Sequence, residues 1–75
     1  MMQSKTLWKK TLIDNVLSNP INTYLSITVI IDRIRLSCGV CLEYNEVRYI
    51  LEDSECSFEY STVNSNNTKK YAILG

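Results

Sequence analysis

The chain has 75 residues, a length that allows one small domain with a thin hydrophobic core. Eight Lys and Arg residues balance eight Asp and Glu residues, so no overall positive field can hold nucleic acid by phosphate neutralisation alone. No apolar run approaches the roughly 20 residues that cross a bilayer, and the first residues lack the apolar segment of a signal peptide. The sequence therefore predicts one domain over residues 1–75, in the cytoplasm or nucleus and away from membranes.

The first predicted element is a helix over about residues 4–18. Its apolar residues recur at three- to five-residue steps and form one stripe: Leu7, Trp8, Leu12, Ile13, Val16 and Leu17. Pro20 would end this helix, because the residue before a proline is pushed out of helical dihedrals. The stripe predicts packing on the chain's own domain, with docking to another protein as the alternative.

From residue 24 the apolar residues alternate with a period of two, which predicts β-strands. The predicted strands cover about residues 24–31, 34–43, 47–52, 56–63 and 68–74. Asp32 and Arg33 form the first predicted turn, and Gly39 a bend within the second strand. A polar loop at 64–67 precedes the last strand. These features predict a mostly β domain, in which an N-terminal helix leads into a five-stranded antiparallel small barrel.

The segment Gly39–Asp53 resembles the first Sm motif, with a strand, an aromatic-Asn corner and a second strand that ends in Leu-Glu-Asp. The segment Lys69–Gly75 resembles a weaker second Sm motif. With the predicted helix and five strands, these residues make the chain similar to the Sm and LSm family, including bacterial Hfq. The resemblance implies an Sm-like fold, which is a small SH3-like barrel.

In the Sm family the corner after the second strand binds an RNA base. Here Tyr44 keeps the aromatic residue, Asn45 stands where the family has Asp, and Arg48 supplies a cation. These three residues are the candidate RNA contacts that the resemblance implies. Val47 takes the place of a stacking residue and Leu74 that of an Arg, so the implied base pocket is depleted.

A barrel with a depleted pocket resembles the Sm-fold Gemin subunits of the survival-motor-neuron complex. This resemblance implies a non-catalytic scaffold that pairs, through its strand edges, with another Sm-like protein during snRNP assembly for mRNA splicing. The candidate interface residues are Phe58, Tyr60, Tyr71 and Ile73. The alternative is an RNA-binding ring subunit of the LSm or Hfq type, and a third hypothesis is a small viral or phage inhibitor.

The three cysteines are an odd number, which is typical of reduced thiols inside a cell. Cys38 and Cys41 have the spacing of a zinc knuckle or redox pair, but only Cys56 could join them and the chain has no His. We therefore predict Cys38 to be a small core residue and expect no metal or other cofactor. The lack of His and of a Gly-rich phosphate loop also predicts that the chain is not an enzyme.

Overall fold

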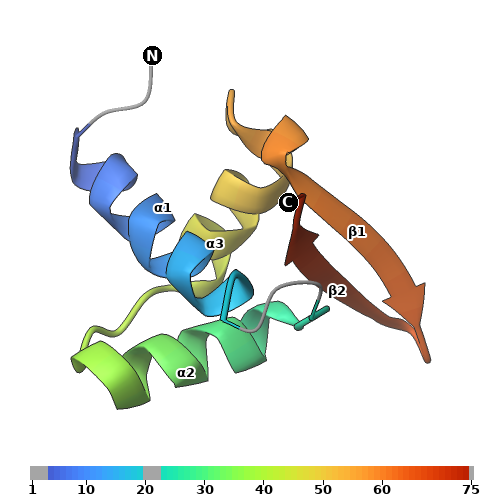
Figure 1. The fold of residues 1–75 in the computed structure, drawn as a ribbon, viewed down its shortest axis with the longest axis horizontal. Coiled ribbons are helices and arrows are strands. Elements are labelled where there is room, and N and C mark those ends of the chain that lie inside the picture. Colours follow the sequence, from blue (N-terminus) through green and yellow to red (C-terminus); the bar gives the residue numbers. More distant parts are fainter. Residues whose placement is uncertain (1–3, 20–22, 75) are drawn as a thin grey trace.

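The computed structural model describes residues 4–19 and 23–74, and this part of the chain forms three helices followed by a β-hairpin (Figure 1). The elements are α1 (Ser4–Leu17), α2 (Ile27–Cys38), α3 (Tyr44–Arg48), β1 (Tyr60–Ser65) and β2 (Thr68–Ile73). A π-helical turn, Tyr49–Asp53, extends α3 directly, and a short 3-10 helix, Ser57–Glu59, precedes β1.

The predicted mostly β, five-stranded barrel is wrong, because helices replace its first three strands. The segment 27–38 is helical, so Asp32 and Arg33 lie inside α2 and form no turn. Ile30 and Ile34 are fully buried there, whereas Leu36, which a strand would place on the same face as Ile34, is 71% exposed. A spacing of three to four residues between buried positions is that of a helix, and in this isoleucine-rich run it overlaps with period-two alternation.

Caps at both ends set the bounds of α2. Ser26 has extended dihedrals, and its hydroxyl accepts a hydrogen bond from the Val29 amide at 3.4 Å. Gly39 adopts the left-handed conformation, with φ at +71°, and its amide donates to the Arg35 carbonyl at 2.9 Å. Gly39 therefore ends a helix, and the bend that was predicted within a strand is wrong.

The two ends of the chain lie closer to the sequence-based expectation. α1 covers the segment in which a helix was predicted, while Pro20 lies outside the described residues. The predicted fourth strand, 56–63, begins only at Tyr60 because residues 57–59 form the 3-10 helix. The last strand, predicted over 68–74, is β2.

The hairpin is antiparallel and in register from the Tyr60–Ile73 pair to the Ser65–Thr68 pair. Asn66 and Asn67 form its two-residue turn, with φ values of 52° and 63°, and Asn is one of the few residue types that tolerate this left-handed geometry. An isolated bridge joins Leu25 to Tyr71, so β2 lies between Leu25 and β1.

All these elements meet in one hydrophobic core, to which α1, α2, α3, the π-helical turn and the hairpin each contribute. Its buried members are Ile13, Leu17, Leu25, Ile27, Ile30, Ile34, Leu42, Val47, Ile50, Leu51, Tyr60 and Tyr71. The hairpin is thereby held against the helices and does not project freely from them. Within the described residues, none of the helices has the length and apolarity needed to cross a membrane.

Candidate nucleic-acid interface

Two consecutive helices, α2 and α3, form a helix-turn-helix unit, and the β1–β2 hairpin follows it in the chain (Figure 1). The connection runs over residues 39–43, slightly longer than the roughly three to four residues usual for this motif, and it contains a glycine, Gly39, as such turns often do. At its end the Glu43 amide donates to the side chain of Glu46 at 3.3 Å, which satisfies a donor at the start of α3. Both ends of the connection are therefore fixed by local hydrogen bonds.

One face of α3 and its π-helical extension points to solvent while the other is buried. The buried side chains are Val47, Ile50 and Leu51. The exposed face carries Tyr44, Asn45, Arg48 and Tyr49. Arg48 lies one helical turn after Tyr44, and Tyr49 lies one helical turn after Asn45. We call these four residues the α3 stripe. Its two tyrosines are each about half exposed, at 52% and 49%.

The structure thus brings together the three candidate RNA contacts predicted from the sequence, Tyr44, Asn45 and Arg48, although on a helix and not at a strand corner. Tyr49 was missed. Its position four residues after Asn45 is the signal that would have identified it, but that signal has meaning only once the segment is known to be helical.

Glu52 joins the hairpin to the helix along one border of the α3 stripe. The Tyr71 hydroxyl donates to its carboxylate at 2.6 Å, and Lys69 Nζ lies 3.2 Å away. Arg48 Nε, in the stripe itself, lies 3.8 Å from the same carboxylate. The hydrogen bond from Tyr71, followed by the contacts with Lys69 and Arg48, lowers the pKa of Glu52, so this carboxylate stays ionised at neutral pH.

An ion pair between Lys9 of α1 and Glu46 of α3 borders the other side of the stripe. The hydrogen bond from Lys9 is the largest cause of a lowered pKa at Glu46. An open groove of about 290 Å³ runs between these helices and is lined by Thr6, Asn45 and Tyr49 among others. Contacts from α1 on one side and from the hairpin on the other therefore hold the stripe in place.

The four candidate subunit-interface residues do not share an exposed surface. Tyr60 and Tyr71 are buried, at 7% and 1% exposure, and their hydroxyls donate to Asp14 and Glu52. Ile73 is partly buried, and Phe58, in the 3-10 helix, is the exposed member of the four at 74%.

The cysteines provide no metal centre in the described part of the chain. Cys38 and Cys41 are exposed and Cys56 is partly exposed, so the prediction that Cys38 is a core residue is wrong. Cys38 ends α2, beyond the last position at which that helix contributes to the core. Among the described residues, no three His, Cys, Asp or Glu side chains come together in a way that could hold a metal ion.

Comparisons with protein-family models, with curated proteins and with solved structures find no match to this chain. The Sm resemblance therefore stays a hypothesis drawn from sequence. The function has to be argued from the geometry of the fold and of the α3 stripe.

Proposed function

We propose that this chain binds duplex DNA, with α3 in the major groove and the β1–β2 hairpin beside the sugar-phosphate backbone. The observation that supports this most is the α3 stripe, an exposed run of polar and aromatic side chains on the second helix of a helix-turn-helix. In proteins with this motif that helix enters the major groove, which at about 12 Å wide admits an α-helix.

The residue types of the stripe suit recognition of base edges. Asn45 can pair with both the acceptor and the donor of adenine, and Arg48 can donate two hydrogen bonds to guanine. Tyr44 and Tyr49 carry hydroxyls that can reach phosphates and rings that can contact thymine methyl groups. One helical face therefore combines base-specific and backbone-binding groups.

Local charge supports the proposal despite the neutral total. Of the three carboxylates on α3 and its extension, Glu46 is paired with Lys9 and Glu52 with Lys69, while Asp53 is exposed and forms no ion pair with a described residue. Lys70, next to Lys69 on β2, forms no ion pair with any described residue and can contact a phosphate. A few such contacts give weak, salt-sensitive binding, to which base contacts would add specificity.

The order of elements gives further support by analogy. Three helices followed by a hairpin, with an isolated strand segment between α1 and α2 that pairs with the hairpin, is the arrangement of a winged helix-turn-helix. Proteins with this arrangement often bind duplex DNA. A fold supports many functions, so this analogy ranks below the residues of the stripe.

Duplex DNA is preferred over RNA because of groove shape. The major groove of A-form RNA is too deep and narrow for side chains to read, so a helix presenting Asn45 and Arg48 suits B-form DNA. The scaffold and ring roles implied by the Sm resemblance lose their structural support, because both require the strands of a barrel that the described residues do not form.

Fluorescence anisotropy with a labelled duplex of random sequence tests the proposal. At about 50 mM salt we expect binding on the order of 1 to 100 µM that weakens steeply toward about 200 mM salt. Arg48→Gln should weaken binding about 5- to 100-fold. Arg33→Gln is the matched control, because Arg33 lies in the groove between α1 and α2 and should leave DNA affinity unchanged.

Three outcomes would overturn the proposal. The first is no anisotropy change at low salt with protein that is folded by circular dichroism. The second is equal loss of affinity in the Arg48 and Arg33 variants. The third is tighter binding to duplex RNA than to duplex DNA of the same sequence.

A protein-binding role is the second candidate, favoured by the outer edge of β1. β1 pairs with β2 on one side and with no other strand of the described chain. Its residues from Ser61 to Ser65 are uncharged, and unpaired strand edges of this kind accept an added strand from a partner. Tyr71, opposite Thr62, uses its amide and carbonyl on Leu25, so the Thr62 amide faces the free edge of β1. Thr62→Pro, which removes that amide, should abolish partner binding of this type while leaving DNA affinity within about twofold.

A further inference from the structure

We infer that the groove between α1 and α2 is a binding site for a small apolar carboxylate, such as a medium-chain fatty acid anion. The groove has a volume of about 380 Å³, within the range of roughly 300 to 1,000 Å³ that is usual for small-molecule sites. It lies apart from the α3 stripe, because residues of α1 and α2 and no residues of α3 line it. The inference therefore goes beyond DNA binding and does not depend on it.

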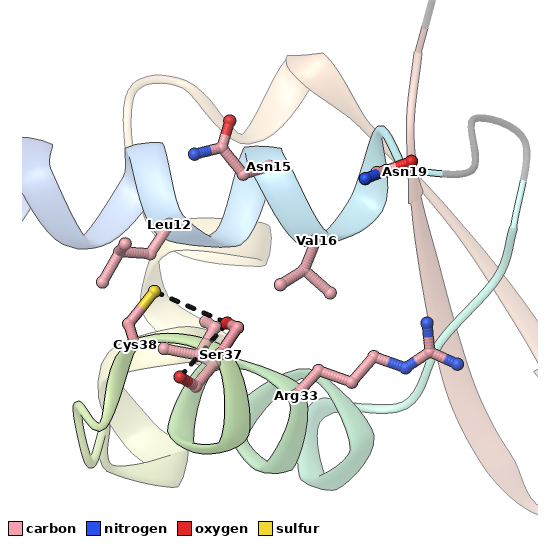
Figure 2. A pocket seen from close by; sticks show the side chains of 8 residues that line it. Leu12, Asn15, Val16, Asn19, Arg33, Ser37 and Cys38 are labelled. Carbon is pink, nitrogen blue, oxygen red and sulfur yellow. Dashed lines mark hydrogen bonds between the residues drawn. The ribbon is translucent and has the colours of Figure 1, made fainter.

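The floor of the groove is apolar and comes from both helices. Leu12 and Val16 of α1 are partly exposed and pack against the core, and Ile34 of α2 is fully buried beneath them. Figure 2 shows the side chains of Leu12 and Val16 pointing from α1 toward α2. A hydrocarbon chain laid along this floor would cover apolar surface that water now contacts, which favours binding.

A cation marks one end of the groove. Figure 2 shows the Arg33 guanidinium and the Asn19 carboxamide on the same side of Val16. Arg33 forms no ion pair with a described residue, whereas Arg35 lies 2.6 Å from Asp32 and Arg48 lies 3.8 Å from Glu52. A guanidinium binds a carboxylate through two parallel hydrogen bonds.

The remaining lining of the groove favours an anion over a cation. The described residues that line it include Arg33 and no acidic side chain. At the end away from Arg33 lie Ser37 and Cys38, whose side-chain oxygen and sulfur are 3.5 Å apart (Figure 2). These small neutral groups bound the space for the tail. The arrangement thus places the carboxylate at Arg33 and the tail along Leu12 toward Cys38.

Binding would affect stability in a measurable way. A ligand that contacts α1 and α2 together binds the folded chain and not the unfolded one, so it raises the midpoint of thermal unfolding by an amount that grows with the logarithm of its concentration above Kd. Octanoate is the probe. Octylammonium, with the same chain length and the opposite charge, and octanol, with no charge, are the matched controls.

The experiment combines thermal unfolding with amide chemical shifts in an NMR titration. We expect octanoate to raise the unfolding midpoint and to shift amides around the groove, octylammonium to do neither, and octanol to bind at least tenfold more weakly. Arg33→Gln should weaken octanoate binding about tenfold or more. Arg35→Gln, on the same helix but already paired with Asp32, should leave it unchanged.

Equal effects of octanoate and octanol, or unchanged binding in Arg33→Gln, would overturn the inference. So would amide shifts that map elsewhere than to the groove. Arg33→Lys guards against a folding defect, since it keeps the charge without the planar fork and should bind octanoate with intermediate affinity. No DNA enters these measurements, so their outcome is independent of the anisotropy test.

Discussion

The hydroxyl of Tyr71, in the last strand, donates to the carboxylate of Glu52, in the extension of α3, at 2.6 Å. The phenol ring is almost fully buried, and its hydroxyl reaches the carboxylate beside Lys69. Glu52 also lies 3.8 Å from Arg48 of the α3 stripe. This hydrogen bond therefore couples the position of the hairpin to that of the proposed DNA-binding face.

Removing that hydroxyl should destabilise the fold without changing the shape of the core. For Tyr71→Phe we expect a loss of about 1.5 to 3 kcal/mol in the free energy of unfolding, the usual range for a hydrogen bond to a charged group. Urea unfolding measures it. Tyr24→Phe is the control, because the Tyr24 hydroxyl makes an exposed hydrogen bond to Ser61 and its loss should cost less than about 0.5 kcal/mol. Equal costs in the two variants would contradict the prediction.

Stability should fall at alkaline pH, because the pKa values of Tyr60 and Tyr71 are raised. Burial is the largest cause for both, and the second is a hydrogen bond, from Tyr60 to Asp14 and from Tyr71 to Glu52. Their stabilising contribution is complete below the unfolded-state pKa of about 10 and is lost above it, as the unfolded chain releases these protons first. Above that pKa, each tyrosine should lower the free energy of unfolding by about 1.4 kcal/mol per pH unit. Lys10 acts in the same direction: burial opposes its charge, but hydrogen bonds from its ammonium to Asp14 and Glu59 outweigh that effect and raise its pKa.

Urea unfolding between about pH 9 and pH 11, in reducing buffer, measures this slope. Tyr60→Phe should reduce the slope by about one proton, and absorbance at the tyrosinate band should show late ionisation in the folded chain. Stability that stays constant through this range would show that the two phenols ionise as freely in the folded chain as in the unfolded one.

Replacing Gly39 should lower the stability of the fold because of the backbone conformation at this position. A Cβ added there meets no atom within 4 Å, so Gly39→Ala creates no clash. The φ of +71° is unfavourable for an L-residue, and we expect a loss of about 1 to 2 kcal/mol. D-alanine, introduced by chemical synthesis, prefers positive φ and should match or exceed the stability of glycine. If both enantiomers destabilise equally, the left-handed cap is not the cause.

In the hairpin turn, unlike at Gly39, one substitution should not lower the stability of the fold. Asn67 has a φ of 63°, which glycine adopts at no steric cost, so Asn67→Gly should leave stability unchanged or raise it by a few tenths of a kcal/mol. Asn67→Val places a β-branched side chain in the same conformation and should cost about 1 to 2 kcal/mol. Hydrogen exchange of the β1 and β2 amides locates the effect, and equal exchange in the two variants would exclude the turn as its origin.

Some features of this protein were predictable from local sequence. The apolar residues of α1 recur at helical steps and predict the helix, although Leu7 and Trp8 are about half exposed and only Ile13 and Leu17 of the stripe are fully buried. The polar segment around Asn66 and Asn67 separates two short strand-forming runs. Both signals arise from residues close together in the chain. Tyr44, Asn45 and Arg48 share one exposed face of α3, but the resemblance that named them placed them at a strand corner, and their role as contacts stays a prediction.

The middle of the chain was decided by tertiary structure. The run from Ile27 to Ile34 is rich in β-branched residues, and its apolar positions fit a strand as well as a helix. Burial of Ile30 and Ile34 against α1 and α3 selects the helix, with Ser26 and Gly39 as its caps. The contact between Tyr71 and Glu52 also depends on tertiary structure. No local pattern predicts it, because the two residues meet only when the hairpin packs against the extended α3. Local periodicity and turn chemistry determined the first helix and the last turn, and the local caps Ser26 and Gly39 set the bounds of α2. Long-range packing decided that the two middle segments are helical and which face the α3 stripe presents.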